Sequence, residues 1–394
     1  MLAPDVPFPP NRGGRADVWR RLCALRSLGH SVLLIFSCES EGASAPTSEA
    51  LRQIEAQVDG VLPLTIPRGL LHGGGRLATL PWRPWHVACR SLNQDRMDRA
   101  VNVVRSFRPD FVWTEGPWMG GLARELSHRL SLQLIYRSHN IEHQYMRGQA
   151  RTARAVRDKL AWTMSCVGLE RYETNLMREA SAVLDISVED LEYWRSRDVR
   201  NLHWLPPLPD PRHSVIGTSG APPLERDVLF LGNLRTPNNV RGVEFLVRDV
   251  APRIEMLRPG TRITVAGSRP TRQVRALVDT LPHAELVADP AEAADLLYTA
   301  RVLVNPVRSG GGVQVKMLDM LMTDVTIVTS VQGTRGLPKH FASLFHITDD
   351  PRQFAEFVCQ GLDKPGVDLK ARVAARQQFG VCALKAIVDA IGRR

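Results

Sequence analysis

Short apolar runs alternate with helix-like segments along most of this chain of 394 residues. They lie at residues 31–36, 110–114, 132–136, 228–231, 263–266, 302–304 and 325–329. Strands that are apolar throughout and separated by helices are typical of a parallel sheet covered on both faces. The pattern therefore predicts an α/β protein with doubly wound sheets.

A proline-rich stretch interrupts this alternation. Residues 204–224 hold six prolines and two glycines, a composition that favours a linker. The alternation restarts directly afterwards, and the chain is long enough for two domains. We predict an N-terminal domain at residues 1–205, a linker at 206–224 and a C-terminal domain at 225–375, with a cleft between the two domains.

The most informative motif follows an apolar strand of the second half. Three glycines, Gly310, Gly311 and Gly312, precede a helix that carries Lys316 on its first turns and Asp319 one turn later. Glycine lets backbone N–H groups approach a ligand, and a helix N-terminus favours an anion. This order of groups suits a phosphate at the glycines and a sugar hydroxyl near the carboxylate. A tight strand–helix connection without a ligand is the simpler interpretation.

The second half resembles the glycosyltransferases of the GT-B fold, of the type in glycosyltransferase family 4. The matching stretches occur in family order over residues 228–337. They include Leu229-Phe-Leu-Gly-Asn-Leu, Ile263-Thr-Val-Ala-Gly, Arg301-Val-Leu-Val-Asn-Pro, the glycine–lysine–aspartate segment and Gly333-Thr-Arg-Gly-Leu. The resemblance implies two Rossmann-like domains that face a central cleft.

The first half resembles the same family more loosely. Residues 4–14 look like the glycine loop that follows the first strand, and His139 occupies the slot of a strand-end histidine. Gly13 and Gly14 would let backbone amides approach the donor phosphates, although a turn after two prolines explains them as well. His139 would contact a phosphate or the donor sugar, or position the acceptor. A loop histidine satisfied by Asn140 or by the backbone is the alternative.

The resemblance implies transfer of a sugar, with retention, from a UDP- or GDP-sugar to a glycan or polyprenyl-linked acceptor. It implies no cofactor and no bound metal. Asp319 would hold the ribose hydroxyls, where family members usually carry glutamate. Lys316 and the three glycines would hold the diphosphate or donor sugar, with Arg241 or Arg308 as a further cation. We predict His139, Lys316 and Asp319 as the catalytic set, in an enzyme of surface polysaccharide assembly.

The chain departs from the family pattern at two donor-side positions. Gly311 stands where many members carry an acidic residue, and Asn233 stands where many carry a phosphate-binding arginine. Arg235 or Arg241 would then replace that arginine.

The ends of the chain carry two further predictions. Only Met1 and Leu2 precede the position where the family's first strand ends, so we expect a truncated first strand and hypothesise a misplaced start codon. Residues 376–394 are predicted to form a helix that packs back on the first domain.

The net charge of +10 permits anionic partners. No zinc-finger spacing, lysine-rich tail or aromatic RNA-binding motif occurs, so we predict no nucleic-acid partner. Residues 66–91 combine tryptophans and leucines with Arg68, Arg76, Arg83 and Arg90, which suits an anionic membrane surface; a loop packed on the first domain is the alternative.

No long apolar stretch and no leading signal segment occurs, and the six cysteines form no CxxC pair. We therefore predict a cytoplasmic protein, peripheral at the inner membrane face. A GT-B epimerase or phosphorylase, a non-catalytic GT-B partner subunit and a basic nucleic-acid binder remain as alternatives.

Overall fold

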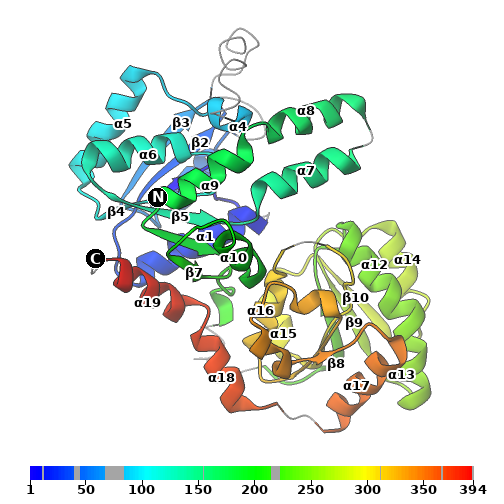
Figure 1. Ribbon diagram of the computed structural model, residues 1–394. Helices are drawn as coiled ribbons and strands as arrows, with labels where there is room; N and C mark the ends of the chain where they lie inside the picture. The colour runs from blue at the N-terminus through cyan, green and yellow to red at the C-terminus, as the bar shows by residue number, and fades with distance from the viewer. Residues whose placement is uncertain are drawn as a thin grey trace. The chain divides into compact units, whose positions relative to one another are not determined.

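The computed structural model describes residues 1–10, 13–39, 45–66, 84–153, 155–213, 222–310, 312–364 and 367–392. The chain forms two compact units (Figure 1). Met1–Leu205 and Leu384–Arg394 make up the first unit, and Pro206–Ala383 make up the second. Each unit is built on a parallel sheet, so the α/β prediction is confirmed.

The first unit contains a seven-stranded sheet in the part that is described. In sheet order the strands are β3 (Gly60–Thr65), β2 (Leu33–Cys38), β1 (Leu2–Ala3), β4 (Phe111–Glu115), β5 (Gln133–Ser138), β6 (Ala182–Asp185) and β7 (Leu202–Trp204). Every pair of neighbours is parallel. The strand order reverses between β1 and β4, so loops leaving these two strands diverge at the carboxyl edge.

Helices cover this sheet. They are α1 (Gly13–Ser27), α2 (Ser48–Glu55), α4 (Trp85–Ala88), α5 (Gln94–Phe107), α6 (Gly120–Leu130), α7 (Glu142–Thr152), α8 (Val156–Cys166), α9 (Leu169–Glu179), α10 (Val188–Arg195) and α19 (Val381–Gly392). The core joins Val104 of α5, Leu126 of α6 and Leu176 of α9 to strand residues such as Ile35 and Leu134. α19 contributes its residues from 384 onward to this unit.

The central strand β1 has two residues. The terminal ammonium of Met1 donates to the carbonyl oxygen of Leu33 at 2.8 Å, and its burial lowers the pKa of that group to about 5. A cavity of about 500 Å³ lies beside this end of the strand, lined among others by Leu25, Val104 and Phe111.

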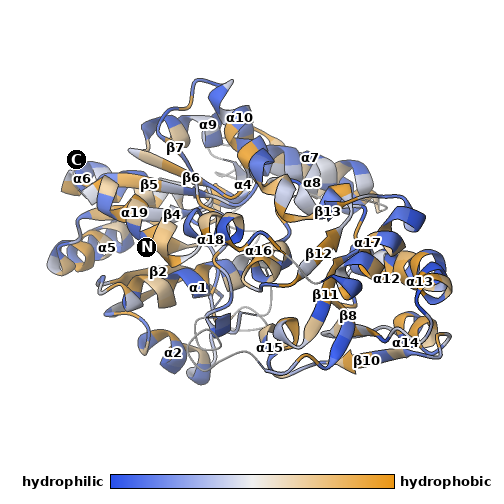
Figure 2. Cartoon of the chain, turned by 90° about the horizontal axis from the view of Figure 1, so that it is seen from below, coloured by the Kyte–Doolittle hydropathy of each residue, from blue (hydrophilic) through white to orange (hydrophobic). Residues whose placement is uncertain are grey.

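The second unit contains a six-stranded parallel sheet in the described residues. In sheet order its strands are β10 (Ala284–Ala288), β9 (Ile263–Gly267), β8 (Arg226–Leu231), β11 (Ala300–Asn305), β12 (Thr326–Thr329) and β13 (His346–Ile347). The order reverses between β8 and β11. The two sheets and their amphipathic outer helices, such as α2 of the first unit, are visible in Figure 2.

The helices of the second unit follow the expected alternation. They are α12 (Pro237–Phe245), the π-helix η2 (Leu246–Val250), α13 (Ala251–Leu257), α14 (Arg272–Val278), α15 (Ala293–Tyr298), α16 (Val315–Leu321), α17 (Pro351–Asp363) and α18 (Leu369–Gln377), with 3₁₀ turns η3 (Val331–Thr334) and η4 (Lys339–Leu344). Residues 237–257 form one continuous helical run of α12, η2 and α13 that begins at Pro237.

Candidate functional site

In the second unit, the predicted donor residues lie at the carboxyl edge of the sheet. The chain leaves β8 towards β9 and leaves β11 towards β12, so the loops after β8 and β11 open a crevice at the point where the strand order reverses. Residues 232–236 form the loop after β8, α12 begins at Pro237, and the glycine–lysine–aspartate segment follows β11.

Lys316 is directed at the first turn of α12, which follows the loop after β8. Its Nζ donates to Asn239 Oδ1 at 2.9 Å and lies 4.5 Å from the ring centroid of Phe230. Removal from water lowers the pKa of this ammonium to about 7. A buried and poorly hydrated cation gains most from an anionic ligand, because the ligand replaces the lost hydration.

The glycines adopt backbone angles that other residues rarely adopt. Gly310 has φ 132° and Gly312 has φ 71°, whereas Gly311 lies outside the described residues. A Cβ at Gly310 would come within 2.7 Å of Asn238 Nδ2. The carbonyl oxygen of Gly310 accepts from Gln332 Nε2 at 3.0 Å, so the loop is tied to η3 after β12.

Arg241 joins this loop to α12. Its guanidinium donates to Asn238 Oδ1 at 2.7 Å and to Ser309 Oγ at 3.0 Å. Arg308 instead lies over the ring of Phe245, 4.0 Å from its centroid. Both predicted arginines are exposed. Of the two, Arg241 hydrogen-bonds both to α12 and to the loop after β11, whereas Arg308 contacts Phe245 of α12.

Asn233, in the family's arginine slot, shapes the loop after β8. Its side-chain oxygen accepts from the Arg235 amide at 3.0 Å, and its carbonyl oxygen accepts from Asn239 Nδ2 at 3.0 Å. Asn239 therefore contacts both this loop and Lys316. The loop is further fixed by Gly267, where a Cβ would lie 1.7 Å from the carbonyl oxygen of Gly232.

Asp319 has partners that the sequence did not indicate. Its Oδ1 accepts from the Asp210 amide at 2.9 Å and lies 3.4 Å from His213 Nε2. His213 is almost fully buried, and its Nδ1 lies 2.8 Å from the hydroxyl of Tyr298. Residues 206–213, predicted as linker, thus belong to the second unit and hold the predicted ribose carboxylate.

In the first unit, His139 lies directly after β5 between two carboxylates. Its Nε2 lies 2.8 Å from Glu115 Oε2, and its Nδ1 lies 3.3 Å from Asp17 Oδ2. The imidazole is 21% exposed, whereas Asp17 is 3% and Glu115 is 0% exposed. Both ring nitrogens therefore have a carboxylate partner, and a ligand that needs either nitrogen must displace one.

Two buried arginines complete this cluster. Arg21 lies 2.9 Å from Asp17 and 3.0 Å from Glu115, and Arg137 lies 3.2 Å from Asp17. Burial alone would raise the pKa of both carboxyls, but Arg21 and His139 hold the pKa of Glu115 below its usual range. Arg21, Arg137 and His139 lower the pKa of Asp17 in the same way.

The carboxylates and imidazole of this cluster also converge closely enough to suit a metal ion. The two arginines already neutralise the two carboxylates, however, so a divalent cation would face no net negative charge. The cluster therefore fits a buried ion network that fixes α1 against β4 and β5.

The predicted glycine loop lies beside this network. α1 begins at Gly13, and a Cβ at Gly14 would meet nothing within 4 Å. Packing inside the unit thus does not require glycine at position 14.

Most of the predicted membrane segment lies outside the described residues, including Arg68, Arg76 and Arg83. Arg90 is described, and it donates to Ser37 Oγ at 3.1 Å and to the carbonyl oxygen of His86 at 3.0 Å. Its guanidinium is therefore directed into the unit. Among the described residues, no helix is both long and apolar enough to cross a bilayer.

Comparisons with known proteins agree with this architecture. Residues 225–364 match the family model of Glycosyl transferases group 1. An uncharacterized 44.6 kDa protein in the cps region of Klebsiella pneumoniae is 22% identical over 369 residues, which cover 91% of this chain and 89% of that protein.

Solved glycosyltransferase structures align with the whole chain. HepE from Anabaena in complex with UDP has a TM-score of 0.60 at 12% identity, covering 100% of this chain and 99% of its own. A glycosyltransferase from Rickettsia africae gives 0.62 at 10% identity, with 100% and 97% covered. WaaG, a glycosyltransferase of lipopolysaccharide biosynthesis, gives 0.53 at 14% identity, with 97% and 94% covered. The predicted GT-B fold and the family resemblance are confirmed.

Proposed function

We propose that this chain, a GT-B protein whose residues 225–364 belong to Glycosyl transferases group 1, is a retaining glycosyltransferase. It transfers a hexose from a nucleotide-diphosphate sugar to a glycan or lipid-linked acceptor, without a metal. Lys316 carries this proposal, because its buried ammonium lies at the crevice between the loops after β8 and β11.

The donor class and pathway rest on the relatives. HepE has been solved with UDP and with UDP-glucose, which supports a UDP-sugar donor here. The relative from a cps region supports a role in surface polysaccharide assembly. A lipid-linked acceptor would place the enzyme at the cytoplasmic face of the inner membrane, as a peripheral protein.

The donor-side residues have separate tasks in this proposal. Lys316, Arg241 and the amides of the glycine loop hold the diphosphate, where negative charge grows as the glycosidic bond breaks. Arg308, exposed beside them, adds a second guanidinium. Cations and N–H dipoles fixed before the reaction stabilise that charge without the reorganisation that water would need.

Asp319 holds the ribose hydroxyls. A carboxylate offers about four acceptor sites, so it can bind the ribose while Asp210 and His213 fix its orientation. A shorter aspartate in place of glutamate depends more strongly on such fixation, because it cannot adjust its reach.

His139 acts as a positioning group on the acceptor side. Its two carboxylate contacts orient the ring, and its exposed edge contacts the sugar or acceptor. The amides at Gly13 and Gly14 would approach the donor phosphates from the same unit.

Isothermal titration with UDP and GDP, followed by a nucleotide-sugar hydrolysis panel, tests the proposal. Asp319→Ala should weaken nucleotide binding about 10- to 100-fold, the effect of losing charge-assisted hydrogen bonds. Asp279→Ala, an exposed carboxylate at the end of α14, should leave binding unchanged. If the wild type binds neither nucleotide, the chain is a non-catalytic GT-B partner and the proposal fails.

A further inference from the structure

Helix α8 of the first unit exposes an aligned apolar surface. Val156 is 74%, Leu160 is 60%, Met164 is 40% and Val167 is 42% exposed. Spacings of four, four and three residues place these side chains on one face of the helix. We call this surface the α8 face.

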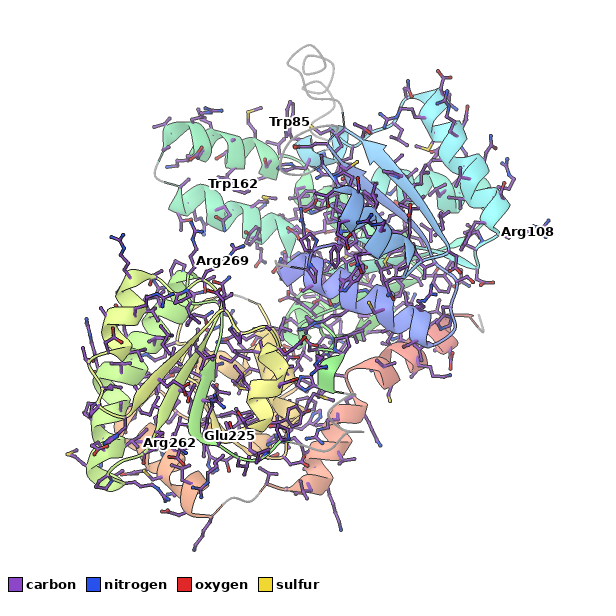
Figure 3. The ribbon with its side chains drawn as sticks, turned by 180° about the vertical axis from the view of Figure 1, so that it is seen from behind. Trp85, Arg108, Trp162, Glu225, Arg262 and Arg269 are labelled. Atoms are coloured by element: carbon purple, nitrogen blue, oxygen red, sulfur yellow. The ribbon has the colours of Figure 1, made fainter. Side chains whose placement is uncertain are left out.

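The opposite side of α8 provides its attachment to the unit. Ser165 is the buried residue of this helix, and its hydroxyl lies 3.2 Å from His86 Nε2. Figure 3 shows α7 and α8 as a hairpin that extends from the sheet, with Trp162 on α8. The last turn of α8 is therefore attached to the unit through Ser165, and its apolar residues at 156, 160, 164 and 167 are exposed.

Single exposed apolar residues are common, but an aligned set on one helix indicates an interaction surface. Replacing water at such a surface favours binding in proportion to the apolar area covered. The α8 face thus needs an apolar occupant.

The surrounding charges indicate which occupant. Residues 147–159 contain five basic residues and one acidic residue. Helical spacing places Arg157 and Lys159 on opposite edges of the α8 face. Among the described residues Arg151, Arg157 and Lys159 make no ion pair, whereas Arg147 pairs with Glu170 at 2.7 Å.

An apolar face edged by cations suits an anionic bilayer. The apolar side chains enter the boundary between headgroups and acyl chains, and the cations contact the phosphates. A second copy of this chain fits less well, because a two-fold contact would bring the same cations together.

We propose that the α8 face docks on an anionic lipid bilayer. This docking rests on the proposed function in one respect: a lipid-linked acceptor would lie in the same bilayer. It places the membrane contact on α8, in a different segment from the one predicted at residues 66–91.

Sedimentation of the full chain with vesicles tests the docking. Vesicles of three parts phosphatidylcholine to one part phosphatidylglycerol should bind the wild type, and vesicles of phosphatidylcholine alone should bind at least 10-fold less. The double variant Leu160→Ser/Met164→Ser, and separately Arg157→Glu/Lys159→Glu, should each lower the partition coefficient at least 10-fold.

The chain offers a matched control on the second unit. Leu369 and Val373 are 53% and 49% exposed, four residues apart on α18, so Leu369→Ser/Val373→Ser removes a similar apolar pair. This control should bind vesicles like the wild type. Unchanged thermal midpoints and UDP affinities would show that the α8 variants are folded.

Three outcomes overturn the docking: no binding by the wild type, binding retained by both α8 variants, or equal loss in the α18 control. Light scattering that finds a dimer abolished by the Leu160→Ser/Met164→Ser variant, without vesicle binding, would assign the α8 face to self-association. UDP binding is measured separately, so vesicle binding without UDP binding refutes the proposed function alone.

Discussion

The burial of Lys316 makes donor affinity depend on pH. Its pKa is about 7 in the unliganded chain, and the diphosphate binds the charged form, so binding above pH 7 must take up a proton. The dissociation constant then rises in proportion to one plus the ratio of neutral to charged lysine. Between pH 6.5 and 8.5 this factor grows about 25-fold, equivalent to about 1.9 kcal/mol. Affinity is therefore greatest below pH 7 and falls above it.

Isothermal titration with UDP-glucose at pH 6.5, 7.5 and 8.5 measures this effect. Two buffers of different ionisation enthalpy report the proton uptake directly, which should approach one proton per donor at pH 8.5. Lys316→Arg keeps its charge throughout this range and should bind with little pH dependence. A wild-type affinity constant within twofold over the range, without proton uptake, would refute the assignment of Lys316 to the diphosphate.

Three further substitutions probe the framework of the site. Gly267→Ala should lower the free energy of unfolding by about 3 kcal/mol or more, because its Cβ would overlap the Gly232 carbonyl oxygen; an unchanged urea midpoint would contradict this. Glu115→Gln should cost about 3–5 kcal/mol in the same assay, since a buried arginine loses its charged partner, and a loss below about 1 kcal/mol would argue against the ion network. His213→Phe should weaken UDP binding about 5- to 10-fold by releasing Asp319, and loss of stability with unchanged affinity would show that His213 is only structural.

The elements of the fold were predictable because their signals are local. The apolar run at 302–304 lies in β11, which spans Ala300–Asn305, and Pro306, which follows the strand directly, marks its end in the sequence. The helical run of α12, η2 and α13 fits the predicted alternation of strands and helices, but its π-helical middle was not expected. Helical periodicity sets the position of a helix, whereas a π-turn depends on how side chains pack against neighbouring elements.

The donor side of the candidate site was partly predictable for the same reason. Lys316 and the glycines form one contiguous motif, and a βα crossover brings it to the edge of the sheet beside the loop after β8. Asn239, the partner of Lys316, lies in the first turn of α12, directly after that loop. Asp210 and His213 carried no comparable signal, because a proline-rich segment favours a linker and its folding back onto Asp319 is a tertiary contact.

The ion network around His139 shows most clearly which contacts could not be predicted from the sequence. Asp17 and Arg21 lie four residues apart, and on sequence alone such a pair indicates an exposed helix surface worth a few tenths of a kcal/mol. Both are buried, and each has a further ion-pair partner on a strand: Glu115 of β4 pairs with Arg21, and Arg137 of β5 pairs with Asp17. A buried charge that loses its partner is costly, so α1 is fixed against β4 and β5 by electrostatics as well as by packing. The glycine loop enters α1, and His139 contacts the same carboxylates, so the orientation of both depends on one set of charges.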